Sequence, residues 1–318
     1  MAKDSIYTPL LVNLFGWKVQ PGVWMAGYEI SGNKTGLFCI IGMPGRHSLS
    51  PAMHNAGFKK LGIDAVFLAF DVPKEKLKSA VEGMRAYGMK GMTLTSPHKL
   101  EVMKYIDGID PTAKRIGAVN TLVNTDGSIK GYNTDAAGFY ESIRATARLE
   151  GRKFVIIGAG GAARAFSFAI AEKVRNPSIA ILNRHPEKAK RLAAEIRGFA
   201  DLDITSGGLD AKGMEKAMDN AYLIANATNI TLENSKETPV PKRFLKRGMV
   251  VFDANYVPLE NRLLVDAKSV GCRTISGLDL LLYQGLAAFR LFTGKTAPVE
   301  EMRKALLAAN SRKDKDSG

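Results

Sequence analysis

Cysteine and histidine are scarce in this chain. Its 318 residues include two cysteines and four histidines. Cys39 and Cys272 stand far apart in apolar segments, which indicates reduced core thiols and argues against a disulfide framework. His47 and His54 have no partners at the spacing of metal ligands, so no metal site is predicted. This use of thiols and imidazoles is typical of a cytoplasmic protein.

Long apolar runs are absent as well. No segment is apolar over enough residues to cross a bilayer, and residues 1–4 do not open a signal peptide. Apolar residues make up 46% of the chain and charged residues 24%, which is the composition of a soluble globular protein. The length suits one large domain or two ordinary ones. We therefore predict a globular protein without a membrane partner.

Acidic residues are few relative to basic ones, 31 against 45, which gives a net charge of +14. Nucleic-acid binding would use such a charge, but the basic residues are spread along predicted helices and no basic block alternates with aromatic residues. A positive field also suits an anionic small substrate and a phosphate-rich cofactor. We therefore predict small-molecule partners and no nucleic acid.

Residues 91–100, GMTLTSPHKL, combine features that rarely occur together. The run from Met92 to Thr95 predicts a buried strand. Ser96 and Pro97 then predict a helix start, with Ser as the N-cap and Pro at the first helical position. Lys99 would lie in the first helical turn, where the local field favours a neutral amine that can transfer protons. A solvated surface lysine is the alternative interpretation.

Strand-like and helix-like segments alternate in the first half. Apolar strands are predicted at 37–42 and 65–71, and an amphipathic helix at 73–87 leads to the strand after Gly91. Repeated strand–helix–strand units predict a largely parallel sheet, whose ligands gather at the carboxyl ends of its strands.

Polar side chains follow these strands. Ser48 and Ser50 offer two hydroxyls to a carboxylate or phosphate at a helix start, unless Ser50 is only a cap. The Asn-Thr pairs at 120–121 and 133–134 bind a hydroxyl-rich ligand or merely satisfy turn backbone. Asp135 begins a predicted helix, so a ligand-binding carboxylate and an N-cap both remain open.

The second half carries a more specific pattern. A strand predicted at 154–157 runs into Gly158-x-Gly160-x-x-Ala163 and then a helix of small residues. Gly158 permits a tight turn, Gly160 lets backbone approach a pyrophosphate, and Ala163 lets helix and strand pack closely. A glycine-rich turn between a strand and a helix predicts a dinucleotide-binding, Rossmann-type domain.

The residues that follow the next predicted strand, 178–182, indicate which cofactor is bound. The strand ends in Asn183 and Arg184, with Lys188 one turn later, and no acid stands between Ser178 and Pro186. A guanidinium and an ammonium here favour a 2′-phosphate, so NADP is predicted in preference to NAD.

A long amphipathic helix is predicted at 277–293, packed back on the first domain with Gln284 facing inward. A buried glutamine needs a hydrogen-bond partner, and a polar substrate is one candidate.

These segments together resemble the shikimate dehydrogenase family over about residues 37–294. The motifs are HSLSPxMHN at 47–55, TSPHK at 95–99, AVNT at 118–121, GYNTD at 131–135, GAGGAARA from Gly158, NR at Asn183, NAT at Asn226, and Gly277-x-x-x-Leu-x-x-Gln284. The resemblance implies an NADP-dependent oxidoreductase of aromatic amino acid biosynthesis. It would interconvert shikimate and 3-dehydroshikimate by hydride transfer.

The resemblance also implies roles for single residues. Lys99 would be the general acid/base, assisted by Asp135. Substrate would be bound by Ser48, Ser50, Thr93, Thr95, Asn120, Tyr256 and Gln284. Cofactor would be bound by Gly158, Ala159, Gly160, Gly161, Ala162, Asn183, Arg184, Lys188, Thr228 and Gly277.

The implied architecture is α/β with two domains. Residues 1–135 and 278–318 would form an N-terminal substrate domain closed by C-terminal helices, and residues 136–277 an inserted Rossmann-type NADP-binding domain. We expect residues 1–35 to be an ordered extension, whose role the sequence does not indicate. We expect the protein to be a monomer or homodimer.

One departure leaves the substrate open. The family usually has Asn-Val-Thr where this chain has Thr93-Leu94-Thr95, so an amide that contacts a ring hydroxyl is missing. A quinate/shikimate dehydrogenase with broader substrate or NAD use is therefore an alternative. A catalytically silent, NADP-binding regulator is an alternative of another class.

Overall fold

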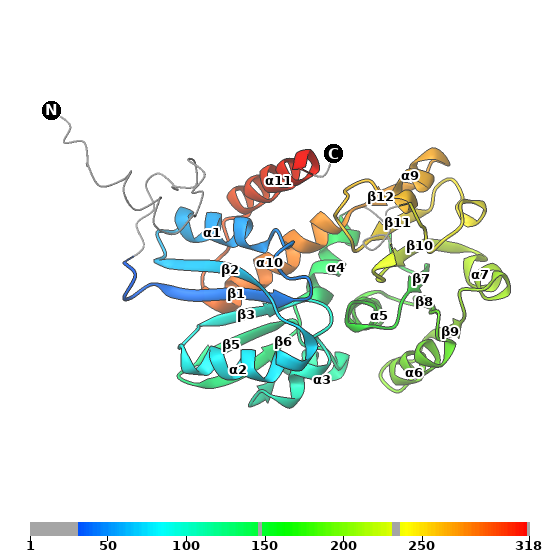
Figure 1. The fold of residues 1–318 in the computed structure, drawn as a ribbon. Helices are drawn as coiled ribbons and strands as arrows, with labels where there is room; N and C mark the ends of the chain where they lie inside the picture. The colour runs from blue at the N-terminus through cyan, green and yellow to red at the C-terminus, as the bar shows by residue number, and fades with distance from the viewer. Residues whose placement is uncertain (1–30, 146–147, 231–235, 317–318) are drawn as a thin grey trace.

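Two six-stranded sheets organise the molecule, one in each half of the chain (Figure 1). The computed structural model describes residues 31–145, 148–230 and 236–316. The expected ordered extension falls mostly outside these residues, and only its last part is seen, where Ser31 and Thr35 donate hydrogen bonds to Asp64. None of the described helices has the length and apolar character needed to span a membrane.

The first sheet is mixed. Its strands are β1 (Gly36–Gly42), β2 (Ala65–Asp71), β3 (Gly91–Leu94), β4 (Gly108–Ile109), β5 (Thr121–Thr125) and β6 (Ser128–Tyr132). They lie in the order β2-β1-β3-β5-β6-β4. The first three are parallel, as predicted, but β5 runs antiparallel to β3 and β6. Because β6 and β4 run in the same direction as β3, the prediction of a largely parallel sheet is confirmed, with β5 as the exception.

The antiparallel pairing follows from a tight turn. Asp126 and Gly127 connect β5 to β6 with φ angles of 50° and 92°. An Asp-Gly pair adopts positive φ readily, and a two-residue turn of this kind joins antiparallel strands. The signal was present in the sequence at 126–127.

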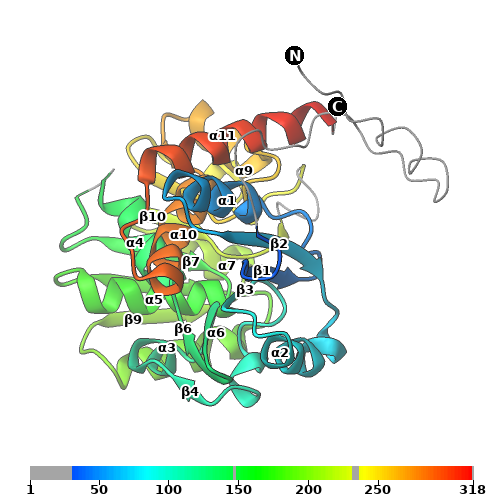
Figure 2. The same ribbon diagram turned by 90° about the vertical axis from the view of Figure 1, so that its left-hand side faces the viewer.

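Helices cover both faces of this sheet. One face packs against α2 (Leu77–Ala86), which buries Leu77, Val81 and Met84. The other packs against α1 (Ser50–Lys60), α10 (Gly277–Thr293) and α11 (Val299–Asp316). Figure 2 shows α11 lying along α1, so the last described helix packs on the helices that cover the first sheet.

The second sheet is fully parallel. Its strands are β7 (Lys153–Ile157), β8 (Ser178–Leu182), β9 (Asp203–Gly207), β10 (Ala221–Asn226), β11 (Val250–Asp253) and β12 (Arg273–Ile275). The order β9-β8-β7-β10-β11-β12 is that of a Rossmann sheet, whose ligands bind where the order reverses. Its helices are α5 (Gly161–Lys173), α6 (Pro186–Arg197), α7 (Ala211–Met218) and α9 (Arg262–Ser269).

The two halves meet along α4 (Asp135–Arg144), which contacts both α5 and α10. Phe139 of α4 stacks on Phe166 of α5 at a ring-centroid distance of 4.1 Å, and it forms a T-shaped pair with Phe252 of β11 at a centroid distance of 5.1 Å. These three rings are fully buried. The helix that begins at Asp135 is therefore held by apolar contacts with the second half of the chain.

The helix predicted to start at Ser96 and Pro97 is not formed. Residues 96–100 make turns around a cis Ser96–Pro97 peptide, and the next helical residues are the short 3₁₀ turn η2 (Glu101–Lys104). Tertiary contacts override the local signal. The ring of His98 bonds the Val72 carbonyl at 2.8 Å, and the Lys99 carbonyl accepts the Val119 N–H at 2.8 Å. Lys99 therefore does not lie in the first turn of an α-helix, and the electrostatic argument based on that position was wrong.

Candidate active site

Four polar segments meet at one edge of the first sheet. Two follow the carboxyl ends of the parallel strands β1 and β3. Because β5 is antiparallel, its amino end lies beside the carboxyl ends of β3 and β6, with Thr121 paired to both Thr93 and Tyr132. Asn120, which precedes β5, and Asp135, which follows β6, thus lie at the same edge. A fully parallel sheet would have placed Asn120 at the opposite edge.

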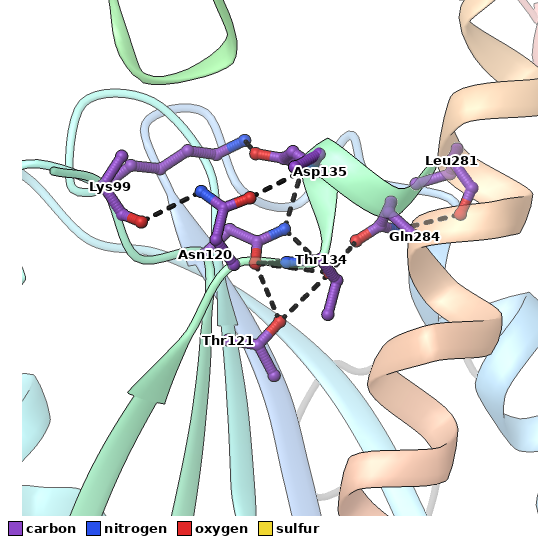
Figure 3. Close-up of polar contacts among 10 residues, drawn as sticks. Lys99, Asn120, Thr121, Thr134, Asp135, Leu281 and Gln284 are labelled. Atoms are coloured by element: carbon purple, nitrogen blue, oxygen red, sulfur yellow. Dashed lines mark hydrogen bonds and ion pairs between the residues drawn. The ribbon is translucent and has the colours of Figure 1, made fainter. Parts of the chain in front are cut away.

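Lys99 and Asp135 form an ion pair at this edge (Figure 3). The Lys99 Nζ atom lies 2.6 Å from Asp135 Oδ2, and the two side chains are 18% and 6% exposed. Asp135 is the first residue of α4, and its carboxylate bonds Lys99 and Asn120 instead of capping the helix. An amine that is partly open to solvent and held by a buried carboxylate has the arrangement of a proton-transfer group.

Three hydroxyls gather beside the start of α1. Ser48 Oγ donates to Ser50 Oγ at 3.0 Å and accepts the Ser50 N–H at 3.1 Å. The Tyr256 hydroxyl bonds Ser48, and desolvation raises the pKa of Tyr256 against the lowering effect of that bond. Ser50 is the first residue of α1, and Leu49 occupies the cap position. Such a hydroxyl cluster at a helix N-terminus can bind a carboxylate.

The remaining predicted substrate residues line the same region. Thr93 is buried, and its hydroxyl lies 3.5 Å from the Cys39 carbonyl. Thr95 is half-buried with its methyl group toward Gly42. Gln284 is buried and donates to the Leu281 carbonyl at 2.9 Å.

The predicted dinucleotide turn follows β7. Gly158 has φ +122°, a conformation that L side chains rarely adopt, and its position faces the Ala227 carbonyl. At Gly160 a Cβ atom would meet no atom within 4 Å, so the backbone there is open to an approaching group. The backbone N–H groups of the first turn of α5, which include Gly161 and Ala162, follow directly, and Ala159 is half-buried. This geometry fits a pyrophosphate at the helix N-terminus.

The candidate 2′-phosphate residues lie beyond β8. Asn183 accepts the His185 N–H at 2.9 Å through Oδ1, which shapes the turn into α6. Arg184 and Lys188 are exposed. Two flexible cations and an amide at the end of this strand fit a phosphate group and offer nothing that repels it.

A buried amide–carboxylate network, which was not predicted, supports the far side of this site. Asp253 Oδ1 accepts from Asn226 at 3.1 Å and from the Asn255 side chain at 3.0 Å. Asn255 in turn donates to the Thr228 carbonyl at 2.8 Å and accepts the Gly277 N–H at 3.3 Å. The network therefore holds both Thr228 and Gly277. Two signals for it were present in the sequence: Asn226 belongs to the NAT motif, and Asn226 and Asp253 each end an apolar strand.

Neither a disulfide nor a metal cluster is seen in the described part of the chain. Cys39 and Cys272 are buried free thiols, as predicted, and burial raises the pKa of Cys39 to about 12. No group of three or more potential ligand side chains lies together among residues 31–145, 148–230 and 236–316.

A Rossmann sheet with a glycine-rich turn, joined to a second α/β sheet that carries a lysine–carboxylate pair, defines a two-domain protein of the nucleotide-dependent dehydrogenase class. Comparisons with known proteins identify the group within this class. The family model of the shikimate dehydrogenase substrate binding domain matches residues 40–122. The model of the shikimate 5'-dehydrogenase C-terminal domain matches residues 277–307.

Relatives match along most of the chain. A shikimate dehydrogenase (NADP(+)) of Moorella thermoacetica is 45% identical over 277 residues, which are 86% of this chain and 94% of that protein. A crystal structure of a shikimate dehydrogenase in complex with NADP+ has a TM-score of 0.81 at 41% identity and covers 89% of this chain and 98% of its own. One from Thermus thermophilus, in complex with NADP(H) and shikimate, has a TM-score of 0.77 at 36% identity and covers 86% and 100%.

This chain belongs to the shikimate dehydrogenase family. The resemblance predicted from its motifs is confirmed, and so is the two-domain α/β fold with a Rossmann-type half.

Proposed function

We propose that this protein is an NADP-dependent shikimate dehydrogenase that interconverts shikimate and 3-dehydroshikimate. The observation that carries the proposal is the Lys99–Asp135 pair, 2.6 Å apart, in a chain 45% identical to an NADP-dependent shikimate dehydrogenase. The pair lies at the edge of the first sheet, beside the glycine-rich turn of the second. The intact pair argues against the alternative of a catalytically silent regulator.

Lys99 acts as the general acid/base in this proposal. During oxidation its neutral amine accepts the proton of the C3 hydroxyl, and during reduction its ammonium returns a proton to the same oxygen. Asp135 holds the amine in place through Oδ2 and offers its remaining lone pairs to ring hydroxyls. NADP, when bound, supplies the nicotinamide that takes up or delivers the hydride.

Substrate orientation falls to the polar groups around the pair. The hydroxyls of Ser48, Ser50 and Tyr256 would bind the substrate carboxylate, since Ser48 already lies within hydrogen-bond distance of the other two. The ring hydroxyls would be met by Thr93, Thr95 and Gln284. Asn120, which was expected to bind them as well, would act through Asp135, because its amide is already bonded to Thr134 and Asp135. Contacts to the substrate carboxylate at one end of the ring and to the ring hydroxyls at the other end fix which ring carbon faces Lys99.

Cofactor binding is assigned to the second half. The turn from Gly158 to Ala162 would hold the pyrophosphate at the N-terminus of α5, and Thr228 and Gly277 would line the opposite wall. Asn183, Arg184 and Lys188 would hold the 2′-phosphate, which gives NADP its preference over NAD.

The proposal extends to organisation and location. Residues 1–135 with 278–318 would form the substrate domain and residues 136–277 the cofactor domain. We expect a cytoplasmic monomer or homodimer.

Thr93 supports a second candidate, a quinate/shikimate dehydrogenase. The threonine hydroxyl is shorter than the family's asparagine amide, and it faces a backbone carbonyl of the neighbouring strand. A ring hydroxyl therefore loses one partner, which relaxes the discrimination between shikimate and the more hydroxylated quinate.

Steady-state kinetics of the purified protein test these proposals. The four pairings of shikimate or quinate with NADP or NAD are compared by kcat/KM. We expect the highest value for shikimate with NADP. A higher value for quinate with NAD would favour the second candidate, and NADP binding without turnover on either acid would indicate the regulator.

A further inference from the structure

We infer that Thr121 is a positioning residue of the proposed reaction: its buried hydroxyl fixes the Asn120 amide, and that amide aims Asp135 at Lys99. The inference rests on the proposed function and deepens it. It concerns a residue that contacts none of the reacting groups directly.

The Asn120 side chain is fully engaged inside the protein (Figure 3). Its Oδ1 atom accepts the Thr134 N–H at 2.8 Å and the Thr121 hydroxyl at 3.0 Å. Its Nδ2 atom donates to Thr134 Oγ1 at 3.0 Å and to Asp135 Oδ1 at 2.9 Å. Both lone pairs and both hydrogens therefore have partners, and the residue is only 2% exposed.

These partners permit one orientation of the amide. If oxygen and nitrogen were exchanged, the NH₂ group would face the Thr134 backbone N–H, and the amide oxygen would face the Asp135 carboxylate. The first contact pairs two donors and the second pairs two acceptors, so both are repulsive. The Thr134 N–H and the Asp135 carboxylate thus determine which way the amide faces, and the Thr121 hydroxyl, as a second donor to Oδ1, holds the amide in that position.

Because of this donor, the two oxygens of the Asp135 carboxylate have different partners. Oδ1 is held by Asn120, and Oδ2 is left for Lys99 at 2.6 Å. A carboxylate gripped at one oxygen cannot rotate without breaking a charge-assisted hydrogen bond. The hydrogen bond from Asn120 therefore fixes the direction of the second oxygen. That oxygen in turn fixes the position of the Lys99 amine.

Thr121 contacts this network through the side chain of Asn120. It is the first residue of β5 and is fully buried. Its hydroxyl donates to Asn120 Oδ1 and lies 3.4 Å from Thr134 Oγ1. Thr134 continues the network to α10 by donating to Gln284 Oε1 at 3.4 Å. Thr121 contacts neither Lys99 nor Asp135 through its hydroxyl, so that hydroxyl can be removed without touching the ion pair.

The test compares Thr121→Val, which keeps the shape and removes the hydroxyl, with Thr121→Ser, which keeps the hydroxyl. Thr125→Val, at the exposed end of the same strand, is the matched control. We expect Thr121→Val to lower kcat roughly 3- to 10-fold, the effect of one neutral hydrogen bond. KM for shikimate and the dissociation constant of NADP should change less than two-fold. Thr121→Ser and Thr125→Val should keep kcat within two-fold of the wild type.

A double-mutant cycle shows whether the effect passes through the amide. In an Asn120→Ala background, Thr121→Val should cost nothing further, because the group it positions is gone. An independent, additive loss would overturn the inference. So would an unchanged kcat in Thr121→Val, or a loss in Thr121→Ser as large as that in the valine variant.

A readout without turnover separates this inference from the proposed function. The side-chain NH₂ signal of Asn120 in ¹⁵N-labelled protein is assigned by its loss in Asn120→Ala. We expect slow exchange of these protons with solvent in the wild type and at least ten-fold faster exchange in Thr121→Val. If the wild type fails to oxidise shikimate, the proposed function falls, and this exchange measurement alone then decides whether Thr121 holds the amide. Equal exchange rates in both proteins would overturn the inference.

Discussion

Gly161 lies directly against the side chain of Lys99, although the first belongs to the half of the chain with the second sheet and the other to the half with the first sheet. A Cβ atom at position 161 would be 3.1 Å from Lys99 Cβ and 3.3 Å from its Cδ. The first residue of α5 therefore packs on the stem of the proposed acid/base. The glycine therefore has two structural roles, since it is the first residue of α5 and it leaves room for the Lys99 side chain.

Gly161→Ala should lower kcat roughly ten-fold, because the new methyl group pushes the lysine stem by a few tenths of an ångström out of line. KM for NADP should change less. Gly160→Ala is the matched variant, as its methyl group meets no protein atom within 4 Å. It should instead raise KM for NADP by blocking the pyrophosphate. Steady-state kinetics of both variants check the pair of outcomes, and identical behaviour would contradict the Lys99 contact as the cause.

Lys99→Met should lower kcat by roughly two to four orders of magnitude, because it removes the general acid/base and keeps the length of the side chain. Lys104→Met is the control, since that lysine is exposed and forms an ion pair with Glu101 at 2.9 Å on the surface. The measurement is kcat and KM for shikimate at saturating NADP. A rise in KM with unchanged kcat would make Lys99 a binding residue.

Arg184→Ala should raise KM for NADP roughly 10- to 100-fold and leave KM for NAD within about two-fold, because only NADP carries the phosphate that a charged hydrogen bond would hold. Arg191→Ala changes the net charge equally on the exposed side of α6 and should do little. Initial rates with each cofactor give the four constants. Equal effects of Arg184→Ala on both cofactors would refute the 2′-phosphate assignment.

His54 should make the folded state sensitive to acid. It is fully buried, stacks on Phe67 at a centroid distance of 4.4 Å, and has no hydrogen-bond partner at either ring nitrogen among the described residues. Burial lowers the pKa of His54 from 6.5 to about 3. Between these two values the unfolded chain binds a proton that the folded protein does not bind. The free energy of unfolding therefore falls as the pH falls below 6.5, by about 2 kcal/mol at pH 5.

Urea unfolding at pH 7.5 and pH 5.0 measures this effect. The loss of unfolding free energy between the two should be about 2 kcal/mol smaller in His54→Leu than in the wild type. Part of the acid dependence remains in that variant, because burial also lowers the pKa of His98. His47→Gln, at an exposed position, should behave like the wild type. Equal losses in His54→Leu and the wild type would contradict the prediction.

Local patterns in the sequence predicted much of the fold. The strands β2 and β8 and the helix α10 were expected with the bounds that they have, and the glycine turn at Gly158 was expected before α5. Each is indicated by a local pattern of apolar residues or by a backbone angle that one residue type permits. Such preferences are written into short windows of sequence.

Other features came only from the tertiary structure. The helix expected at Ser96 is replaced by turns, because the His98 ring and the Lys99 carbonyl find partners elsewhere in the fold. The antiparallel course of β5 was signalled by Asp126 and Gly127, but its consequence for Asn120 required the strand order.

The sequence by itself determined the kinds of groups available: a lysine, an aspartate, a hydroxyl cluster and a glycine-rich turn, each tied to its own segment. Only the tertiary structure brought these groups together. It places Lys99 2.6 Å from Asp135 and packs Gly161 on the same lysine. The physical reason is distance along the chain. Contacts between residues 36 or 62 positions apart depend on strand order and helix packing, which no local preference encodes.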